Sequence, residues 1–295
     1  MHLRELLVEA RDLALHFALT ALPTETCSNI GARLGLSVGR GGHPAAAERS
    51  RVVLSRLRPE LGDGPPLEEA LVTLWQNVGR TFAEYSVVQR ILREGRVTFA
   101  DPAQFDAVMG DQRPLILCLL HLGNWGIMSE AIARRWPGRV AAIALVDRKR
   151  AHKIISRRWR KWTETLVLEV HRNVWRPTVE HLKRPGGVLI LAGDEQHAGR
   201  VLAPFLGRPP VTDGNLGRMV RLASATGARI MPVYCERLPG VRFKVHGLPP
   251  MEFNVDRRDE AAMLQAVLRL DAQIEPVVRR YLEQWYVAVE LDLTR

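Results

Sequence analysis

From about residue 114 onward, short apolar runs alternate with stretches of helical periodicity, and this alternation limits the possible folds more than any other feature. Buried strands of a parallel sheet read as short, nearly continuous apolar runs, and helices usually connect them. Four runs fit this description: 115–120, 140–146, 187–192 and 229–235. Helices are expected between them, around 124–136, 149–165, 174–184 and 213–226. We therefore predict an α/β fold with a central mixed sheet flanked by helices.

The end of the chain fits the same architecture. Residues 241–246 alternate between apolar and polar at period two, which predicts a strand with one wetter face. A helix is expected from about 260 to 282, and Pro276 should kink or interrupt it. A last apolar run follows at 285–289.

The first hundred residues carry helical periodicity. Helices are expected over 3–22, from about 26, over 44–58 and, after the Gly/Pro break at 62–66, over 67–93. We predict a helical N-terminal portion (1–100) that docks on a membrane or substrate, followed by an α/β core (101–295), the two forming one compact unit. Charged residues interrupt the segment 3–22, so it is interpreted as an amphipathic docking helix or a plain packing helix rather than a membrane span.

The chain is strongly basic. Its 42 Lys+Arg against 32 Asp+Glu give a formal charge of +10, which suits an anionic membrane surface, a phosphorylated lipid, an acidic protein or nucleic acid. Charge is the only feature that favours nucleic acid, because no recognised nucleic-acid-binding module is present, so none is predicted. The three scattered cysteines do not suggest a disulfide framework.

A basic segment lies in the middle of the chain. Between residues 148 and 161 there are eight cations, and apolar side chains recur at helical spacing among them. This pattern is typical of a helix that lies on anionic lipid, and it would equally receive an acidic protein partner. A solvated charged face remains an alternative.

His121 is the strongest catalytic candidate. It follows a predicted strand directly and begins the segment His-Leu-Gly-Asn-Trp, after which a helix is expected. Ligands of open α/β sheets bind beyond the carboxyl ends of strands, and imidazole is a general base that works near neutral pH. Gly123 permits close approach of the backbone to a substrate, and N–H groups at a helix start suit an oxyanion. A structural histidine on this turn is the alternative.

Five segments in register resemble the late acyltransferases of lipid A, the lauroyl and myristoyl transferase family. They are 75–84, the His121 segment 121–125, 187–196 with its Asp-Glu-Gln, 203–212 and 222–233, and the terminal Glu-Gln-Trp-Tyr at 283–286 also fits. The resemblance implies transfer of a fatty acyl group from an acyl thioester, carried by acyl carrier protein or coenzyme A, to a hydroxyl of an anionic membrane lipid. It implies no metal or other cofactor, and a peripheral location on the cytoplasmic face of the inner membrane.

The resemblance also suggests roles for individual residues. His121 would be the general base, backbone N–H groups near Gly123 and Asn124 would hold the oxyanion, and Arg148 and Arg158 would bind the head group or the carrier. One residue departs from the pattern, because Gly126 stands where the family has an acidic partner of the histidine.

Three consequences of Gly126 remain open. Another carboxylate can replace the missing one, and Glu195 is our first choice, with Asp194 and Glu130 as further candidates. The histidine can also work unassisted at a lower rate. Alternatively, the chain is a catalytically impaired relative that binds lipid or acyl carrier.

Overall fold

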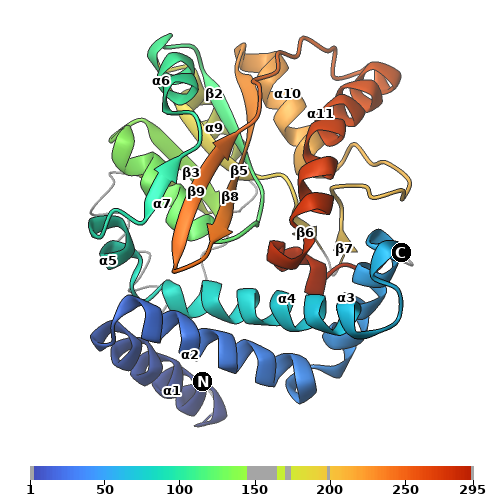
Figure 1. The fold of residues 1–295 in the computed structure, drawn as a ribbon. Helices are drawn as coiled ribbons and strands as arrows, with labels where there is room; N and C mark the ends of the chain where they lie inside the picture. The colour runs from blue at the N-terminus through green and yellow to red at the C-terminus, as the bar shows by residue number, and fades with distance from the viewer. Residues whose placement is uncertain (1–2, 145–164, 170–173, 198–199, 294–295) are drawn as a thin grey trace.

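The computed structural model of the chain describes residues 3–144, 165–169, 174–197 and 200–293. Within these residues a seven-stranded mixed sheet forms the centre of the molecule, as predicted, and helices lie on both of its faces (Figure 1). The strand order is β1-β9-β8-β2-β5-β3-β4. The strands are β1 (Val97–Phe99), β2 (Leu115–Leu119), β3 (Val140–Ala144), β4 (Leu166–Glu169), β5 (Val188–Ala192), β8 (Arg229–Leu238) and β9 (Arg242–Gly247).

Five adjacent strands, from β8 to β4, run parallel, and the β8–β9 hairpin makes the sheet mixed. The four predicted apolar runs are β2, β3, β5 and β8, and the alternating run is β9. The edge strands β1 and β4 escaped prediction because three or four residues are too few to establish a period. A separate two-stranded ribbon joins β6 (Gln196–His197) and β7 (Arg200–Val201).

The N-terminal part is helical, as predicted, and α1, α2 and α4 lie together below one end of the sheet (Figure 1). The elements are α1 (Leu3–Ala21), α2 (Thr24–Ser37), the π-helical η1 (Val38–Gly42), α3 (Pro44–Leu57), η2 (Pro59–Leu61), α4 (Pro65–Glu84) and α5 (Val88–Arg93). The expected single helix over 67–93 is wrong, because the chain leaves α4 after Glu84 and begins α5 at Val88. Glu84, at the end of α4, pairs with Arg237 of β8, and Tyr85, at the start of the turn, packs against α7 (Trp125–Arg135), as described below.

The remaining helices connect the strands. They are α6 (Pro102–Gly110), α7 (Trp125–Arg135), α9 (Trp175–Leu182), α10 (Asn215–Thr226), α11 (Glu260–Arg280), η3 (Leu282–Gln284) and η4 (Tyr286–Val289). The sequence predicts that Pro276 kinks or interrupts the last long helix. Pro276 lies inside α11, and the helix continues through it without interruption. Among the described helices none is long and apolar enough to cross a membrane.

The sheet divides the buried side chains into two cores. Alternate residues of β2 and the position after it, Ile116, Cys118 and Leu120, face the core that includes α10 and α11. Leu117 and Leu119 face the opposite core, with α7. Burial of both faces explains why β2 is a continuous apolar run, and it leaves polar side chains to gather where the strands end.

Candidate active site

The register of β2 and β5 brings a histidine and a carboxylate together. These parallel neighbours pair Leu119 with Ala192, the last residue of each strand. His121 and Asp194 each follow two residues later, so both emerge at the same level of the carboxyl edge. The His121 Nδ1 lies 2.8 Å from Asp194 Oδ1. The sheet itself therefore builds a histidine–carboxylate dyad.

Asp194 is held in one orientation by three donors. Besides the His121 ring, its Oδ2 accepts hydrogen bonds from the His121 backbone N–H at 2.8 Å and from the Trp285 indole N–H at 2.7 Å. The Asp194 side chain is completely buried, whereas the His121 side chain is 23% exposed. A carboxylate that orients Nδ1 leaves Nε2 of the partly exposed ring as the nitrogen that can take a proton.

Glu195, the first choice from the sequence, does not occupy this position. Its carboxylate accepts a hydrogen bond from the Asn215 backbone N–H at 2.6 Å and pairs with Arg218 at 3.1 Å. Asn215 is the first residue of α10, so Glu195 places a negative charge at a helix N-terminus. Asp194 rather than Glu195 is in register with His121. The contact with the histidine that was expected of Glu195 is therefore made by Asp194.

Glu130, the third candidate carboxylate, lies on α7 and is also engaged elsewhere. It accepts hydrogen bonds from Gln89 and Arg134. Burial raises the pKa of the Glu130 carboxyl, although both partners act in the opposite direction. These contacts join α7 to α5 rather than to the histidine.

Gly123 shapes the turn after His121. Its φ is +57°, and a Cβ at this position would lie 2.3 Å from the Cys235 carbonyl oxygen, so no other residue fits without a shift. Its N–H donates to the Gln284 carbonyl at 3.0 Å, and its carbonyl accepts from the Thr81 hydroxyl at 2.7 Å. The expected oxyanion role of the Gly123 N–H therefore conflicts with the hydrogen bond that it already makes.

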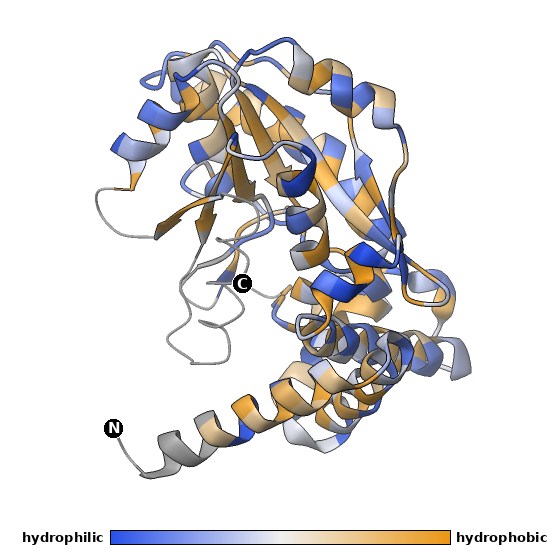
Figure 2. Ribbon diagram, turned by 90° about the vertical axis from the view of Figure 1, so that its left-hand side faces the viewer, coloured by the Kyte–Doolittle hydropathy of each residue, from blue (hydrophilic) through white to orange (hydrophobic). Residues whose placement is uncertain are grey.

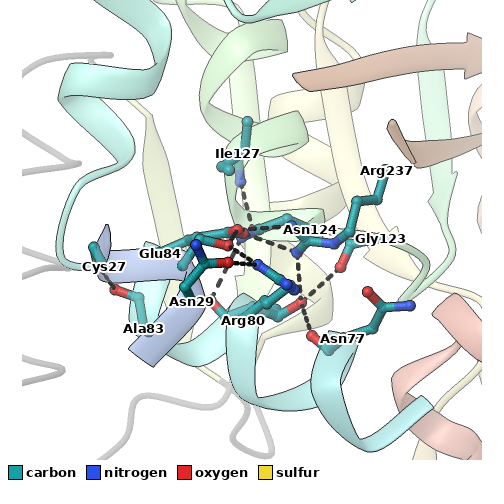
Figure 3. A network of polar contacts seen from close by, with 12 residues as sticks. Cys27, Asn29, Asn77, Arg80, Ala83, Glu84, Gly123, Asn124, Ile127 and Arg237 are labelled. Carbon is teal, nitrogen blue, oxygen red and sulfur yellow. Dashed lines mark hydrogen bonds and ion pairs between the residues drawn. The ribbon is translucent and has the colours of Figure 1, made fainter. Parts of the chain in front are cut away.

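Asn124 is a helix cap inside a buried network (Figure 3). Its Oδ1 accepts from the Ile127 N–H at the start of α7, and its Nδ2 donates to Glu84 Oε2 at 2.9 Å. Glu84 in turn pairs with Arg237 through both oxygens, at 2.6 and 2.8 Å. Asn124 and the Glu84 side chain are fully buried. The Asn124 side chain is thus committed to holding the loop, not exposed to a substrate.

Tyr85 fills the space beside Gly126. A Cβ added to Gly126 would lie 2.2 Å from Tyr85 Cε1. The aromatic ring thus occupies the direction in which a carboxylate at 126 would extend. Burial raises the pKa of Tyr85, so its phenol stays neutral near pH 7. The sequence alone gave no signal of this pairing, because Tyr85 comes from the turn after α4.

An aromatic cluster extends from the dyad toward the surface. The Trp125 ring lies edge-on to the His121 ring, with centroids 4.8 Å apart. Trp125 also contacts Phe82, Tyr85 and Tyr286, with centroid distances between 5.2 and 6.4 Å. Phe82 is 43% exposed, which is high for a large apolar side chain. This cluster offers an apolar surface directly beside the histidine.

The predicted basic residues Arg148 and Arg158, with the whole run 148–161, lie outside the described residues. In the part of the chain that is described, no group of three or more histidine, cysteine or acidic side chains could hold a metal ion.

Comparison with known families gives one match. The model of the family described as bacterial lipid A biosynthesis acyltransferase matches residues 2–288, nearly the whole chain. Among curated proteins, none matches the sequence significantly. The matched range contains the helical N-terminal part, the dyad and the Trp285 segment.

Proposed function

The chain belongs to the bacterial lipid A biosynthesis acyltransferase family, and we propose that it moves a fatty acyl group from a thioester of acyl carrier protein or coenzyme A to a hydroxyl of a membrane lipid or glycolipid. The family acts on an acyl donor and a lipid acceptor. The observation that carries the proposal is the 2.8 Å contact between His121 and the buried Asp194.

In the proposed reaction, His121 Nε2 removes the proton from the acceptor hydroxyl as its oxygen attacks the thioester carbonyl. The imidazolium is stabilised by Asp194, whose negative charge is fixed by three hydrogen bonds. When the tetrahedral intermediate collapses, the carbon–sulfur bond breaks, and the imidazolium returns the proton to the leaving thiolate. No covalent acyl-enzyme is needed.

The developing oxyanion needs hydrogen-bond donors other than Gly123. The N–H groups of Trp125 and Gly126, in the first turn of α7, are the candidates, since a helix start presents unpaired N–H groups toward an anion. The acyl chain would lie along Phe82, Trp125 and Tyr286, because these rings form the apolar surface that begins at His121.

The alternative of a catalytically impaired relative rested on Gly126. Asp194, two residues after the end of β5, places a carboxylate beside the His121 ring, so the histidine has an acidic partner even though residue 126 is glycine. This contact favours the enzyme.

The test compares two adjacent carboxylates. Asp194→Asn and Glu195→Gln are each assayed for thiol release from an acyl thioester and, by mass spectrometry, for the acylated lipid. Asp194→Asn should reduce turnover about 100-fold, within the range for loss of acid–base assistance, whereas Glu195→Gln should stay close to wild type. Equal turnover of Asp194→Asn and wild type would remove Asp194 from the mechanism.

We also propose that the protein lies peripherally on the cytoplasmic face of the inner membrane. Leu15 and Phe17 on α1 are 40% and 51% exposed, and Figure 2 shows hydrophobic residues along much of this helix. Together with the net charge of +10, they suit a membrane that contains anionic lipid. A Leu15→Ser/Phe17→Ser variant should sediment less with anionic vesicles than wild type, and unchanged sedimentation would exclude α1 as the contact.

A further inference from the structure

A polar cavity lies behind the His121 loop, residues 121–124 just before α7. It has a volume of about 390 Å³ and is bounded by α2, α4 and the turn between β8 and β9. The residues on its wall that matter here are Ser28, Asn29, Arg80, Arg237 and Gln284. Figure 3 shows Asn29, Arg80 and Arg237 gathered at this junction. Neither His121 nor Asp194 borders the cavity.

Among the described residues, some of the charged side chains around the cavity are in ion pairs, and one is not. Arg237 is paired with Glu84, and Glu25 on the rim is paired with Arg96 at 2.5 Å. Arg80 donates instead to two neutral oxygens, Ser28 Oγ and Asn29 Oδ1, each at 2.9 Å. In the described part of the chain it makes no salt bridge. The cavity therefore contains one guanidinium whose charge is not balanced by a carboxylate of its own.

This arrangement is unfavourable without an anion. Arg80 is partly buried, and a desolvated charge without a counterion raises the free energy of the folded state. Burial lowers the pKa of the Arg80 guanidinium, and the positive charge of Arg237 lowers it further, while the negative charge of Glu84 acts in the opposite direction. Two guanidiniums thus face the same region, with Glu84 neutralising one of them.

We propose that this cavity binds a phosphate group, held by Arg80 and by the Asn29 side-chain amide. A guanidinium offers several N–H donors in one plane, and phosphate oxygens accept such donors in pairs. The volume of the cavity is sufficient for a phosphate with part of the molecule that carries it. A ligand with a carboxylate would also neutralise the Arg80 charge, but it offers fewer oxygen atoms than a phosphate for Arg80 and Asn29 to bind at the same time.

The position of the site gives it a link to the His121 loop. Gln284 and Arg237, both on the cavity wall, bind each other through the Arg237 N–H and the Gln284 Oε1 at 2.7 Å. The Gln284 carbonyl also accepts the Gly123 N–H. A phosphate group in the cavity would therefore stabilise the wall that supports the loop from behind. This inference does not depend on the proposed acyl transfer.

Thermal unfolding with inorganic phosphate tests the site without any measurement of turnover. Chloride at matched ionic strength corrects for screening. The melting temperature of wild type should rise and saturate with phosphate, because a ligand of the native state stabilises it by mass action. Arg80→Gln should lose the shift, and Arg80→Lys should keep part of it. Arg33→Gln is the control: it removes an exposed arginine of α2, the helix that carries Asn29, and should behave like wild type.

Two further arms distinguish a soluble source of phosphate from a lipid head group. Glycerol 3-phosphate is compared with phosphatidic acid in phosphatidylcholine vesicles. Loss of vesicle binding in Arg80→Gln assigns the site to a lipid head group, and loss of only the glycerol 3-phosphate shift assigns it to a soluble phosphate. No shift in wild type, or the same shift in Arg80→Gln as in wild type, overturns the proposal.

Discussion

The segment that carries His121 is held from two sides, and the two sides differ in chemistry. In front, His121 meets Asp194 with part of the imidazole exposed. Behind, Asn124 donates to Glu84, which pairs in turn with Arg237, and the side chains of Glu84 and Arg237 are 0% and 8% exposed. The front pair keeps one ring nitrogen accessible and can exchange a proton. The rear group, Asn124, Glu84 and Arg237, uses polar atoms of all three side chains for hydrogen bonds within the group, so it fixes the shape of the loop.

This difference predicts opposite consequences of mutation. A change in front should alter turnover and leave folding intact, whereas a change behind should alter the free energy of unfolding. The predictions below test this separation, in order of decreasing expected effect.

His121→Ala should lower turnover about 10²–10⁴-fold, because it removes the proposed general base. Its melting temperature should stay near that of wild type, since Asp194 keeps the hydrogen bonds from the His121 backbone N–H and from Trp285. Thioester turnover and thermal unfolding are measured on the same preparation. Turnover within threefold of wild type would contradict the assigned role.

Glu84→Gln should cost about 3–5 kcal/mol of unfolding free energy, because it leaves the Arg237 charge buried without its counterion. Denaturant titration measures the loss. The matched control is Glu25→Gln, which breaks the half-exposed pair with Arg96 and should cost no more than about 1 kcal/mol. Equal losses in the two variants would show that the rear group is not the rigid support described above.

Gly126→Glu restores the acidic residue of the family pattern and should still not increase turnover. Its Cβ has no room beside Tyr85, so the variant should lose about 1–3 kcal/mol through overpacking. Gly126→Ala carries the same Cβ and should lose a similar amount, which separates the steric effect from the charge. Tyr85→Ala in the same chain should recover part of the stability of either variant. Higher turnover of Gly126→Glu alone would mean that Tyr85 moves away readily.

The sequence predicted five of the seven strands and singled out His121 as the catalytic candidate, but it did not identify the carboxylate that contacts the histidine. Apolar runs identify β2 and β5, but only their register shows that Leu119 pairs with Ala192, and this pairing selects Asp194 over its neighbour Glu195. The contact between Tyr85 and Gly126 likewise depends on where α4 ends, which periodicity does not reveal. The division into portions 1–100 and 101–295 stays a prediction, although the β1 strand from the first portion pairs with β9.

The last prediction concerns a buried carboxylate that, unlike Glu84, makes no salt bridge among the described residues. Asp271 on α11 is 5% exposed and accepts the Phe205 N–H at 3.1 Å. Burial raises the pKa of Asp271 from 3.8 to about 7. Between pH 4 and pH 7, therefore, the Asp271 carboxyl is protonated in the native state, whereas in the unfolded chain it is already ionised. Stability from this group is greatest below pH 4 and is lost as the pH rises through 7.

Asp271→Asn should remove this dependence, because the amide does not titrate and its oxygen can still accept the Phe205 N–H. Between pH 6 and pH 7, wild type should lose about 1 kcal/mol of unfolding free energy relative to the variant. Denaturant titrations across pH 5–8 measure the difference. A variant that follows wild type in parallel through this range would show that Asp271 is already ionised in the native state. In that case Asp271 would be ionised despite its burial and its lack of an arginine partner among the described residues. The proposed difference between buried carboxylates with and without an arginine partner would then be wrong.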